Sequence, residues 1–575
     1  MTCTHCKKDF QITEDDISFY TLFDVPEPRQ CPQCRLVRRL LERNAKSLCY
    51  RTCDLTKEKT LSQYHQDQPF PVYKPSAWWS DEWDGRTYGR DFDFNRPFFE
   101  QFLELKKKVP HCALFNTEGT MQNSDFNNCT AYIKNCYLIA ESDYCEDCYY
   151  SNLLKKCTNI VDCSVTYDSE LCYECVNCTN CYALRYSKDC QQCKDSFFLE
   201  NCASCSNCIG CINQRHKGYM IFNVQYSTEE YKEKLKEFHL DTQEGIEALR
   251  QKCQEFFLTQ PHKAILAEQN ENCVGDQLFN SKNAYYCFDS RDLEDCRYCA
   301  KLTLRVKSSM DYTSWGNQSE LMYQCMGCGD QNYNLKFCVM CQKDMRNCEY
   351  CYECFSCADC FGCVGLKSKK YCILNKQYTK EEYEKLRARV IEHMKKGRVH
   401  STSAQASEVG SRGSQLSEAE LTNQEYGEFF PVGVGAFAYN ESIAMDVYPL
   451  TKEETLAQGY PWRDEKTKSP RPQTYEVPKL IKDVKDDITN EVLACENCSK
   501  NYKIIPQELK FYIQIGIPIP LKCSSCRHRS RMLRRNPPQL WPRTCAHCGT
   551  ETLTSYAPDR PEIVYCEKCY LEAVY

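Results

Sequence analysis

Long apolar runs and a secretory leader are both missing from this sequence. No stretch of about eighteen apolar residues occurs, so no segment is expected to span a membrane as a helix. Met1 leads at once into Cys3, without the charged and apolar regions of a signal peptide. A long cysteine-rich chain of this kind is expected to lie in a reducing, cytoplasmic compartment, where disulfide scaffolds are rare.

Catalytic motifs and excess positive charge are missing too. The chain has no GxxxxGK phosphate loop, no GxSxG serine motif and no HExxH metal motif, and its 10 histidines are scattered. The formal net charge of −6 argues against a polybasic coat for nucleic acid, so any such contact must be local. We expect no enzymatic activity and no small-molecule substrate.

Cysteine, by contrast, is abundant. The chain has 47 cysteines in 575 residues, a density typical of metal-dependent or disulfide-stabilised folds. In a reducing compartment CxxC pairs indicate metal ligands, and four thiolates form the tetrahedral set of a structural zinc. Three zinc sites are predicted: Cys3, Cys6, Cys31 and Cys34; Cys495, Cys498, Cys523 and Cys526; and Cys545, Cys548, Cys566 and Cys569.

The first two sets belong to two copies of one module. Adding 492 to the residue numbers carries the first set onto the second, and the match continues without a gap through Cys53 and Cys545 to Val72-Tyr73 and Val564-Tyr565. Of the four ligands of the third set, the N-terminal copy keeps one as Cys53, whereas Thr56, Lys74 and Ala77 occupy the positions of Cys548, Cys566 and Cys569. Residues 45–77 are therefore predicted to form a ribbon without metal, where Cys49 could support only a weak site.

The N-terminal module resembles a family of small zinc ribbons. The shared features are two CxxC pairs, a Phe-Tyr pair, a proline and a following arginine, here Cys3, Cys6, Phe19, Tyr20, Pro28, Cys31, Cys34 and Arg35. This resemblance implies zinc binding, and the helix-like segment after the second pair implies a treble-clef-like arrangement. As a whole, the chain resembles uncharacterised bacterial cysteine-rich proteins with terminal zinc-ribbon domains, a resemblance that implies no activity.

A second cysteine pattern occupies the centre of the chain. Fifteen cysteines lie at multiples of three from the first, at positions 136, 145, 148, 157, 163, 172, 175, 178, 181, 190, 193, 202, 205, 208 and 211. Period three suits neither a helix nor a flat strand, but a coil with turns of about 18 residues would stack equivalent positions. Asn or Asp often precedes the cysteine, and both tolerate the left-handed backbone of corners. A β-solenoid with cysteine ladders in its core is predicted.

Other interpretations of these cysteines stay open. Strings such as Cys172-x2-Cys175-x2-Cys178 resemble iron–sulfur ligands, and exposed CxxC thiolates can carry electrons. Disulfides are a further alternative. The ladder is favoured because cysteine behaves as a small buried hydrophobe, and because the ferredoxin ending in Cys-Pro and a thioredoxin-like βαβ pattern are both missing.

The solenoid region is duplicated with an offset of 152, which carries Cys202 onto Cys354. Each copy ends in a predicted helix with a capping box, Ser227 with Glu230 and Thr379 with Glu382. Cys325, Cys328, Cys338 and Cys341 fall out of phase, so insertions are expected between about 300 and 340. Further helices are predicted over Asn95–Pro110 and Thr242–Leu258.

The predicted fold class is mainly β with small α: two cysteine-laddered β-solenoid-like repeats flanked by zinc-ribbon modules. The expected domains are a zinc ribbon (1–48), a degenerate ribbon with a linking helix (49–110), solenoid repeat 1 with capping helices (111–258), solenoid repeat 2 with a capping helix (259–399), a flexible linker (400–425), an aromatic packing segment and linker (426–490), a zinc ribbon (491–540) and a terminal zinc ribbon (541–575).

Arginines provide the candidate binding surface. They follow the zinc pairs at helical spacing in both copies: Arg35, Arg38, Arg39 and Arg43, and Arg527, Arg531, Arg534 and Arg535. Guanidinium groups on a rigid helix suit phosphates, whereas the alternatives are a protein-facing role or neutralisation of Zn(Cys)4 charge. The favoured function is a zinc-binding scaffold that contacts RNA or the ribosome. A metal-cluster or thiol redox protein and a pure protein–protein scaffold are the alternatives.

Overall fold

Two compact units make up the chain, and each combines two separate stretches of sequence. The computed structural model describes residues 1–301, 304–327, 329–340, 342–396, 425–464 and 469–574. Unit 1 comprises Met1–Leu114 and Ile265–Arg463, and unit 2 comprises Phe115–Ala264 and Asp464–Tyr575. The N-terminal modules therefore fold with the second repeat, and the C-terminal modules fold with the first. Strand residues (31%) outnumber helical ones (25%), which confirms a mainly β protein with some helix.

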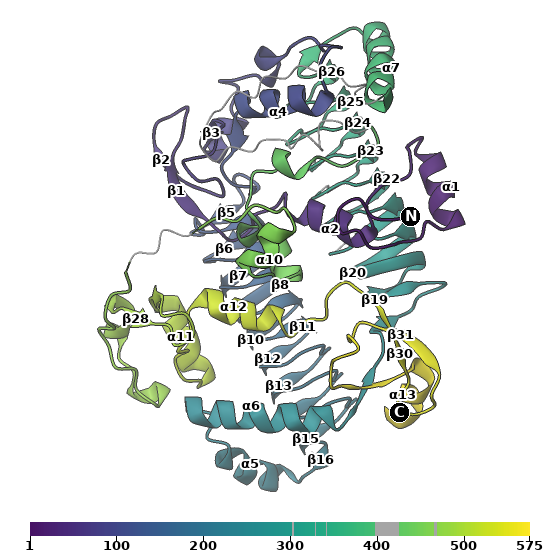
Figure 1. Cartoon of the computed structure of the whole chain (residues 1–575). Helices are drawn as coiled ribbons and strands as arrows, with labels where there is room; N and C mark the ends of the chain where they lie inside the picture. The colour runs from purple at the N-terminus through teal and green to yellow at the C-terminus, as the bar shows by residue number, and fades with distance from the viewer. Residues whose placement is uncertain (302–303, 328, 341, 397–424, 465–468, 575) are drawn as a thin grey trace. The chain divides into compact units, whose positions relative to one another are not determined.

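A long parallel sheet forms the body of unit 2 (Figure 1). Its strands are β5 (Met121–Gln122), β6 (Asn128–Lys134), β7 (Ala140–Tyr149), β8 (Asn152–Val161), β9 (Ser164–Tyr167), β10 (Glu170–Tyr173), β11 (Val176–Thr179), β12 (Tyr182–Arg185), β13 (Lys194–Phe197), β14 (Ser206–Ile209), β15 (Gly218–Ile221) and β16 (Val224–Gln225). Tyr182 pairs with Lys194, and Lys194 with Ser206, so parallel partners differ by twelve in residue number. The longer turn predicted from the sequence is therefore wrong. Because both turn lengths are multiples of three, the cysteine period could not distinguish them.

A left-handed residue at every third position explains the period of three. From Asn135 to Asn207, every third residue has φ between 47° and 57°. All of the Asn and Asp residues that were expected to precede cysteines at corners have this conformation, which they adopt more readily than most residues. Their side chains also bond along the sheet: Asn177 Nδ2 donates to Asp189 Oδ1 at 2.8 Å. A left-handed residue thus recurs every three residues, and each of the fifteen cysteines directly follows one of these residues.

Unit 1 contains a second parallel sheet with a slightly longer repeat. Its strands are β18 (Ala267–Glu268), β19 (Val274–Phe279), β20 (Lys282–Arg297), β21 (Leu304–Met310), β22 (Ser319–Tyr323), β23 (Tyr333–Lys336), β24 (Arg346–Glu349), β25 (Ala358–Phe361), β26 (Lys370–Ile373) and β27 (Lys376–Gln377). Partners differ by thirteen in residue number in the pairings between Arg291 and Arg346, and by twelve from there to Lys370. This confirms the predicted insertions. Cys328 and Cys341 lie outside the described residues.

Cysteines line the buried side of both sheets. In unit 2 they share one apolar cluster with aliphatic residues, and Ile160 pairs directly with Cys172. Aliphatic residues have no metal-binding atom, so their place in the same stacks indicates packing. The thiols also satisfy backbone carbonyls on the neighbouring strand: Cys175 Sγ donates to Leu184 O at 3.3 Å, and Cys338 Sγ to Cys348 O at 3.2 Å.

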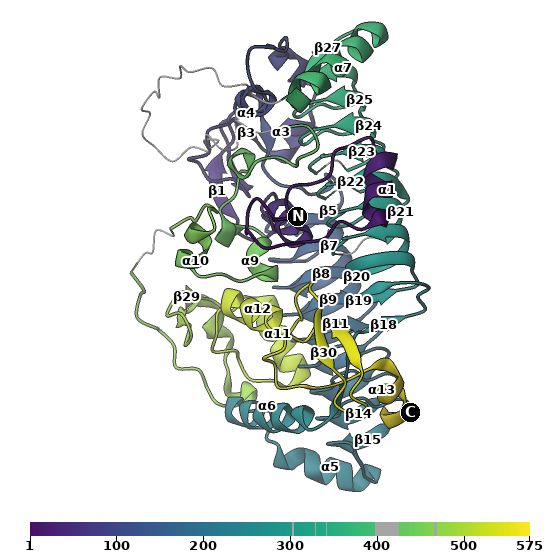
Figure 2. The same cartoon turned by 45° about the vertical axis from the view of Figure 1, so that its right-hand side comes forward.

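Capped helices follow each sheet. α5 (Thr228–Glu237) begins with the predicted box of Ser227 and Glu230, and α7 (Lys380–Lys396) with the reciprocal bonds of Thr379 and Glu382. α4 (Phe98–Lys108) and α6 (Gln243–Leu258) confirm the other two predicted helices. Figure 2 shows α5 and α6 at the end of the sheet of unit 2 that carries β15. No helix in the described part of the chain is long and apolar enough to cross a membrane.

Two equivalent glycines let α4 and α6 approach their sheets closely. Gly210 and Gly362 are offset by 152 and have φ of 60° and 63°. A Cβ at Gly210 would lie 3.0 Å from Cys253 Sγ of α6, and one at Gly362 would lie 2.7 Å from the Phe98 ring of α4. The two units therefore repeat one plan, in which a helix packs on the last strands of a parallel sheet.

Replacing a core thiol tests the packing role of the central cysteines. Cys175→Ala is expected to lower the free energy of unfolding by about 1 kcal/mol, because packing is lost without exposing a charge. Cys175→Asp should be far more destabilising, because a buried carboxylate there has no partner. Thermal melts and metal analysis of both variants provide the measurement. Loss of a metal ion from the alanine variant would contradict the packing role.

Candidate metal centres

Three groups of four cysteines are positioned to hold a metal ion. They are the predicted sets Cys3, Cys6, Cys31 and Cys34; Cys495, Cys498, Cys523 and Cys526; and Cys545, Cys548, Cys566 and Cys569. Within each group, all four Sγ atoms lie within 4.8 Å of one another. Thiolates about 2.3 Å from a tetrahedral zinc would lie about 3.8 Å apart. The Sγ atoms of Cys6 and Cys31 are 3.8 Å apart, and those of Cys498 and Cys523 are 3.7 Å apart, so the geometry fits such an ion.

Helix starts and backbone amides prepare the thiols for a metal. The second pair of each set lies at the start of a helix, α2 (Pro32–Leu40), α12 (Ser524–Met532) or α13 (Glu567–Val574), where the macrodipole favours thiolate. Burial alone would raise the pKa of Cys495, but N–H donors of Cys523 and Cys498 lower it to about 6. Burial would also raise the pKa of Cys545, but hydrogen bonds from backbone N–H groups lower that pKa to about 6. These thiols can therefore lose their protons at neutral pH, as zinc binding requires.

The degenerate ribbon keeps its shape without the ligand set. β1 (Cys49–Thr52) pairs with β2 (Lys59–Ser62) in the same register as β30 (Trp541–Thr544) with β31 (Glu551–Thr554). Cys53 Sγ accepts an N–H bond from Lys74 at 3.3 Å, which matches the bond from Cys566 to Cys545. The side chains of Thr56 and Lys74, two of the lost ligand positions, both contact the Glu58 carboxylate. Two of the lost ligand positions thus contact one carboxylate, and no metal-binding group among the described residues includes Cys49 or Cys53.

In unit 1 the arginine helix packs against the parallel sheet. Arg35 Nε donates to Asp311 Oδ2 at 2.7 Å, and Arg39 Nη1 lies 3.3 Å from Asp311 Oδ1. All three side chains are almost fully buried. Arg38 pairs with Glu428 at 3.4 Å, and Arg43 Nη1 donates to Ser314 Oγ at 3.1 Å. Three of the four arginines lie on α2, and Arg43 follows its end, so the predicted single helix face is wrong at Arg43. All four are buried in contacts within their own unit.

In unit 2 the second arginine helix makes the same contact. Arg527 Nε and Arg531 Nη1 each lie 2.7 Å from an oxygen of Asp162, and all three side chains are buried. Arg527 also pairs with Glu508 at 3.1 Å. Arg534 and Arg535 follow the end of α12, so the predicted helix face does not include them; both are half-buried, and Arg534 donates to Glu174 O at 3.0 Å. The fold thus repeats one carboxylate between two arginines in both units.

The two aspartates occupy equivalent positions in the two sheets. Asp162 and Asp311 differ by 149 in residue number, whereas Gly210 and Gly362 differ by 152. The difference of three arises because three steps of thirteen residues between paired strands follow Asp311, each one residue longer than the steps of twelve in unit 2. The expectation that the arginine faces are open to solvent is wrong for the six buried arginines. Guanidinium groups that pair with buried carboxylates cannot reach a phosphate, so their placement does not support the predicted nucleic-acid role. From the sequence, Asp162 was predicted only as a corner residue before a cysteine. Its equivalence to Asp311 was not predicted, because the insertions in the second repeat change the offset between the two residues.

The central cysteines that the structure describes are not gathered into a group of metal ligands. Among the described residues, the three terminal groups are the ones that bring three or more cysteine, histidine or carboxylate ligands together, and the described cysteines are all free of disulfides. Burial raises the pKa of Cys148, Cys163 and Cys296, whereas hydrogen bonds from neighbouring thiols lower the pKa of Cys145 to about 4 and that of Cys205 to about 3. The grouping of ligands in the described residues gives the iron–sulfur and redox interpretations no support.

A buried polar cluster anchors the metal-free ribbon and was not foreseen from the sequence. Tyr64 donates to Glu353 Oε1 at 2.7 Å, and His111 Nδ1 lies 3.0 Å from Glu353 Oε2. Tyr352 donates to Glu42 at 3.1 Å, and burial raises the pKa of the Glu42 carboxyl. These five side chains are almost fully buried, so they hold the ribbon to the sheet rather than face a substrate.

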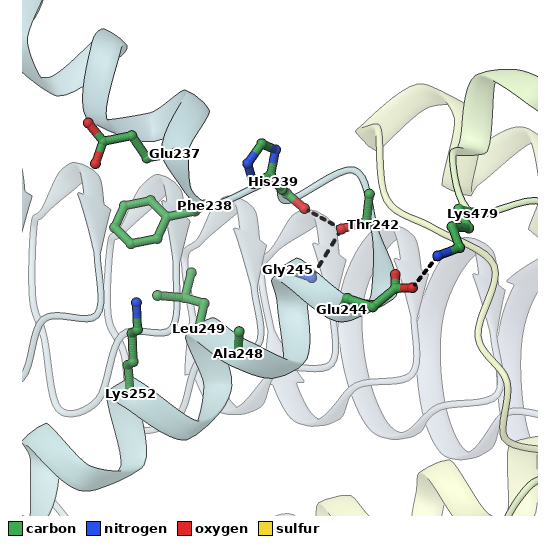
Figure 3. A pocket seen from close by; sticks show the side chains of 10 residues that line it. All are labelled: Glu237, Phe238, His239, Thr242, Glu244, Gly245, Ala248, Leu249, Lys252 and Lys479. Atoms are coloured by element: carbon green, nitrogen blue, oxygen red, sulfur yellow. Dashed lines mark hydrogen bonds and ion pairs between the residues drawn. The ribbon is translucent and has the colours of Figure 1, made fainter.

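The pocket in Figure 3 lies at the elbow between α5 and α6 and has a volume of about 500 Å³. Thr242 caps α6 by accepting a bond from Gly245 N at 3.0 Å, and Glu244 pairs with Lys479 at 3.1 Å. Phe238 and Leu249 supply apolar walls. The polar groups drawn with bonds thus serve helix capping and an ion pair, and we assign the pocket no catalytic role.

Removing one arginine tests the carboxylate contact. Arg531→Ala should lower the free energy of unfolding by about 3–5 kcal/mol, because Asp162 loses a buried partner. The exposed neighbour Arg529 provides a matched control, and Arg529→Ala should change stability by less than about 0.5 kcal/mol. Urea unfolding of both variants gives the comparison. Equal stability of the two would contradict a structural role for Arg531.

Comparison with known proteins adds no relative. No protein-family model matches the chain, and no curated protein sequence matches it. The resemblance to zinc-ribbon proteins therefore continues to rest on the residues that carry it, the two CxxC pairs and the arginine that follows them. Its implication that the metal is zinc stays a prediction, whereas the three four-cysteine groups are a property of the structure.

Proposed function

We propose that this protein is a zinc-stabilised, non-catalytic scaffold that binds other proteins. The observation that carries the proposal is the link between two of the three four-cysteine groups, those ending at Cys34 and Cys526, and a buried Arg–Asp–Arg contact. Cys34 and Arg35 are consecutive, as are Cys526 and Arg527, so a metal at the cysteines would fix the helix that presents the arginines. The metal would act through structure, because four protein ligands leave no open position for a substrate.

The parallel sheets would provide the rigid body of the scaffold. We infer that each sheet coils as a β-solenoid, with one turn for each step between paired strands. The regular register and the left-handed residue in every triplet support this inference. A solenoid offers a long surface whose side chains repeat along its axis, a form that suits binding of extended partners.

RNA binding is the weaker candidate. It was predicted from arginines that the fold buries, and the net charge of −6 disfavours long-range attraction to a polyanion. A redox function would require exposed thiolates among the central cysteines, which are mostly buried. A scaffold role needs neither feature and accounts for the metal sites, the buried arginines and the stacked thiols together.

Metal analysis tests the proposal directly. The purified chain should contain three zinc ions, and a strong chelator should lower the melting temperature, because small zinc modules depend on their metal for stability. Elemental analysis and thermal melts before and after chelation give the result. Iron with a brown chromophore, or six or more zinc ions, would sink the proposal that the central cysteines only pack.

The two matched ribbons provide an internal control. Cys545→Ser should release one zinc ion and unfold the terminal ribbon. Cys53→Ser should leave zinc content unchanged, because Thr56, Lys74 and Ala77 have replaced the other ligands. Zinc counts of the two variants decide between the expectations. Equal zinc loss from both would mean that the degenerate ribbon binds metal after all.

A further inference from the structure

The two zinc-ribbon modules carry different covers. In unit 1, the segment 425–463 runs along helix α2 and the first metal site. Glu425 anchors its start, because its carboxylate accepts N–H bonds from Phe98 and Phe99 at the start of α4, at 2.9 and 2.8 Å. Unit 2 has counterparts of α2, the degenerate ribbon and the sheet, but its own segment, 469–490, packs instead on α11 (Pro506–Ile515), through Ile481 and Ile488.

Acidic and aromatic side chains make the cover in unit 1. Glu428 pairs with Arg29 at 3.1 Å and with Arg38 at 3.4 Å, and the Arg38 guanidinium lies 5.8 Å from the centre of the Phe429 ring. Further along, the ring centre of Tyr460 lies 5.0 Å from that of His5 in the first CxxC pair. The segment therefore contacts a basic helix face with a carboxylate and covers the metal site with an aromatic ring.

In the part of the chain that the structure describes, the equivalent face of unit 2 is exposed. Leu41 is 4% exposed, but its counterpart Leu533 is 63% exposed. Val37 and Arg38 are buried in unit 1, whereas Arg529 and Ser530 at the same positions are exposed. The CxxC pair follows the same trend, since Cys6 is half-buried and Cys498 is exposed. In unit 1 the segment 425–463 contacts Arg38 and Arg43, on either side of Leu41, so the lower exposure there fits the presence of the cover.

The exposed face keeps the chemistry of the covered one. Arg529 and Leu533 are four positions apart at the end of α12 and share one side of the helix. Ser530 occupies the position of Arg38, and the positive charge lies one residue earlier, at Arg529. Leu533 occupies the position of Leu41, so that position is apolar in both copies. An exposed leucine beside an arginine suits an aromatic residue beside a carboxylate.

We propose that Arg529, Ser530 and Leu533 form a docking site for an extended acidic and aromatic segment of another protein. The proposal rests on the scaffold function and names the partner chemistry for it. The cover of unit 1 serves as the template: it places a carboxylate on the arginine and aromatic rings along the helix. Because unit 1 already has its cover, an added segment would bind unit 2.

A labelled peptide with the sequence of residues 425–443 is the probe. Fluorescence anisotropy with the full-length, zinc-loaded chain should give saturable binding with a Kd below about 1 mM. Arg529→Glu and Leu533→Asp should each weaken binding at least tenfold without changing the melting temperature, because both positions are exposed. Leu553→Asp is the matched control, since Leu553 is 43% exposed in the terminal ribbon, and it should leave the Kd unchanged. A peptide with lysine in place of both Glu425 and Glu428 should not bind.

Three results would overturn the docking site: no binding by the native chain, equal binding by all variants, or tight binding of the lysine peptide. A labelled single-stranded RNA tests the other class of partner. RNA binding that Arg529→Glu abolishes and Leu533→Asp leaves intact would assign the face to nucleic acid instead. Each sample is first checked for three zinc ions, so failure of the scaffold proposal is visible separately from failure of the docking site.

Discussion

A buried aspartate between two arginines is the contact on which both units depend. Asp311 holds Arg35 and Arg39, and Asp162 holds Arg527 and Arg531, each on a helix that begins at a four-cysteine group. Burying three charges is costly unless each has a partner at short distance. The metal sites would help meet that condition, because an ion there fixes the helices that carry the arginines. Metal binding and the packing of module against sheet are therefore expected to be coupled.

The parallel sheets depend on a simpler constraint, the left-handed residue in every triplet. It recurs through the strands in which Lys194 pairs with Tyr182, and the cysteines that follow it lie on the buried side of the sheet. Cysteine fits this buried side because it is small and apolar, and its thiol can donate to a carbonyl of the next strand, as Cys175 does. Alanine would leave space there, so the abundance of cysteine has a structural cause.

The two units share one plan but differ in detail. In the N-terminal copy of the second ribbon, the Lys74–Glu58 ion pair and the buried contacts of Glu353 with Tyr64 and His111 are found where the other copy has a four-cysteine group. The N-terminal module is also contacted by the segment 425–463, for example where Glu428 pairs with Arg38. In the C-terminal copy, Leu533 is 63% exposed. The module of unit 1 is therefore the more enclosed of the two.

Local chemistry was readable from the sequence, and long-range pairing was not. The three ligand sets, the capping boxes and the corner positions of Asn and Asp follow from short spacings, because the residues that interact are close in the chain. The step between paired strands depends on which strands become neighbours, and a period of three fits more than one choice. Arg35 and Arg531 are buried by aspartates that lie far from them along the chain. Each terminal module likewise folds with the repeat that is more distant in the sequence. An arginine face has the same helical spacing whether a phosphate or Asp162 lies opposite it. Only the tertiary structure brings the aspartate there.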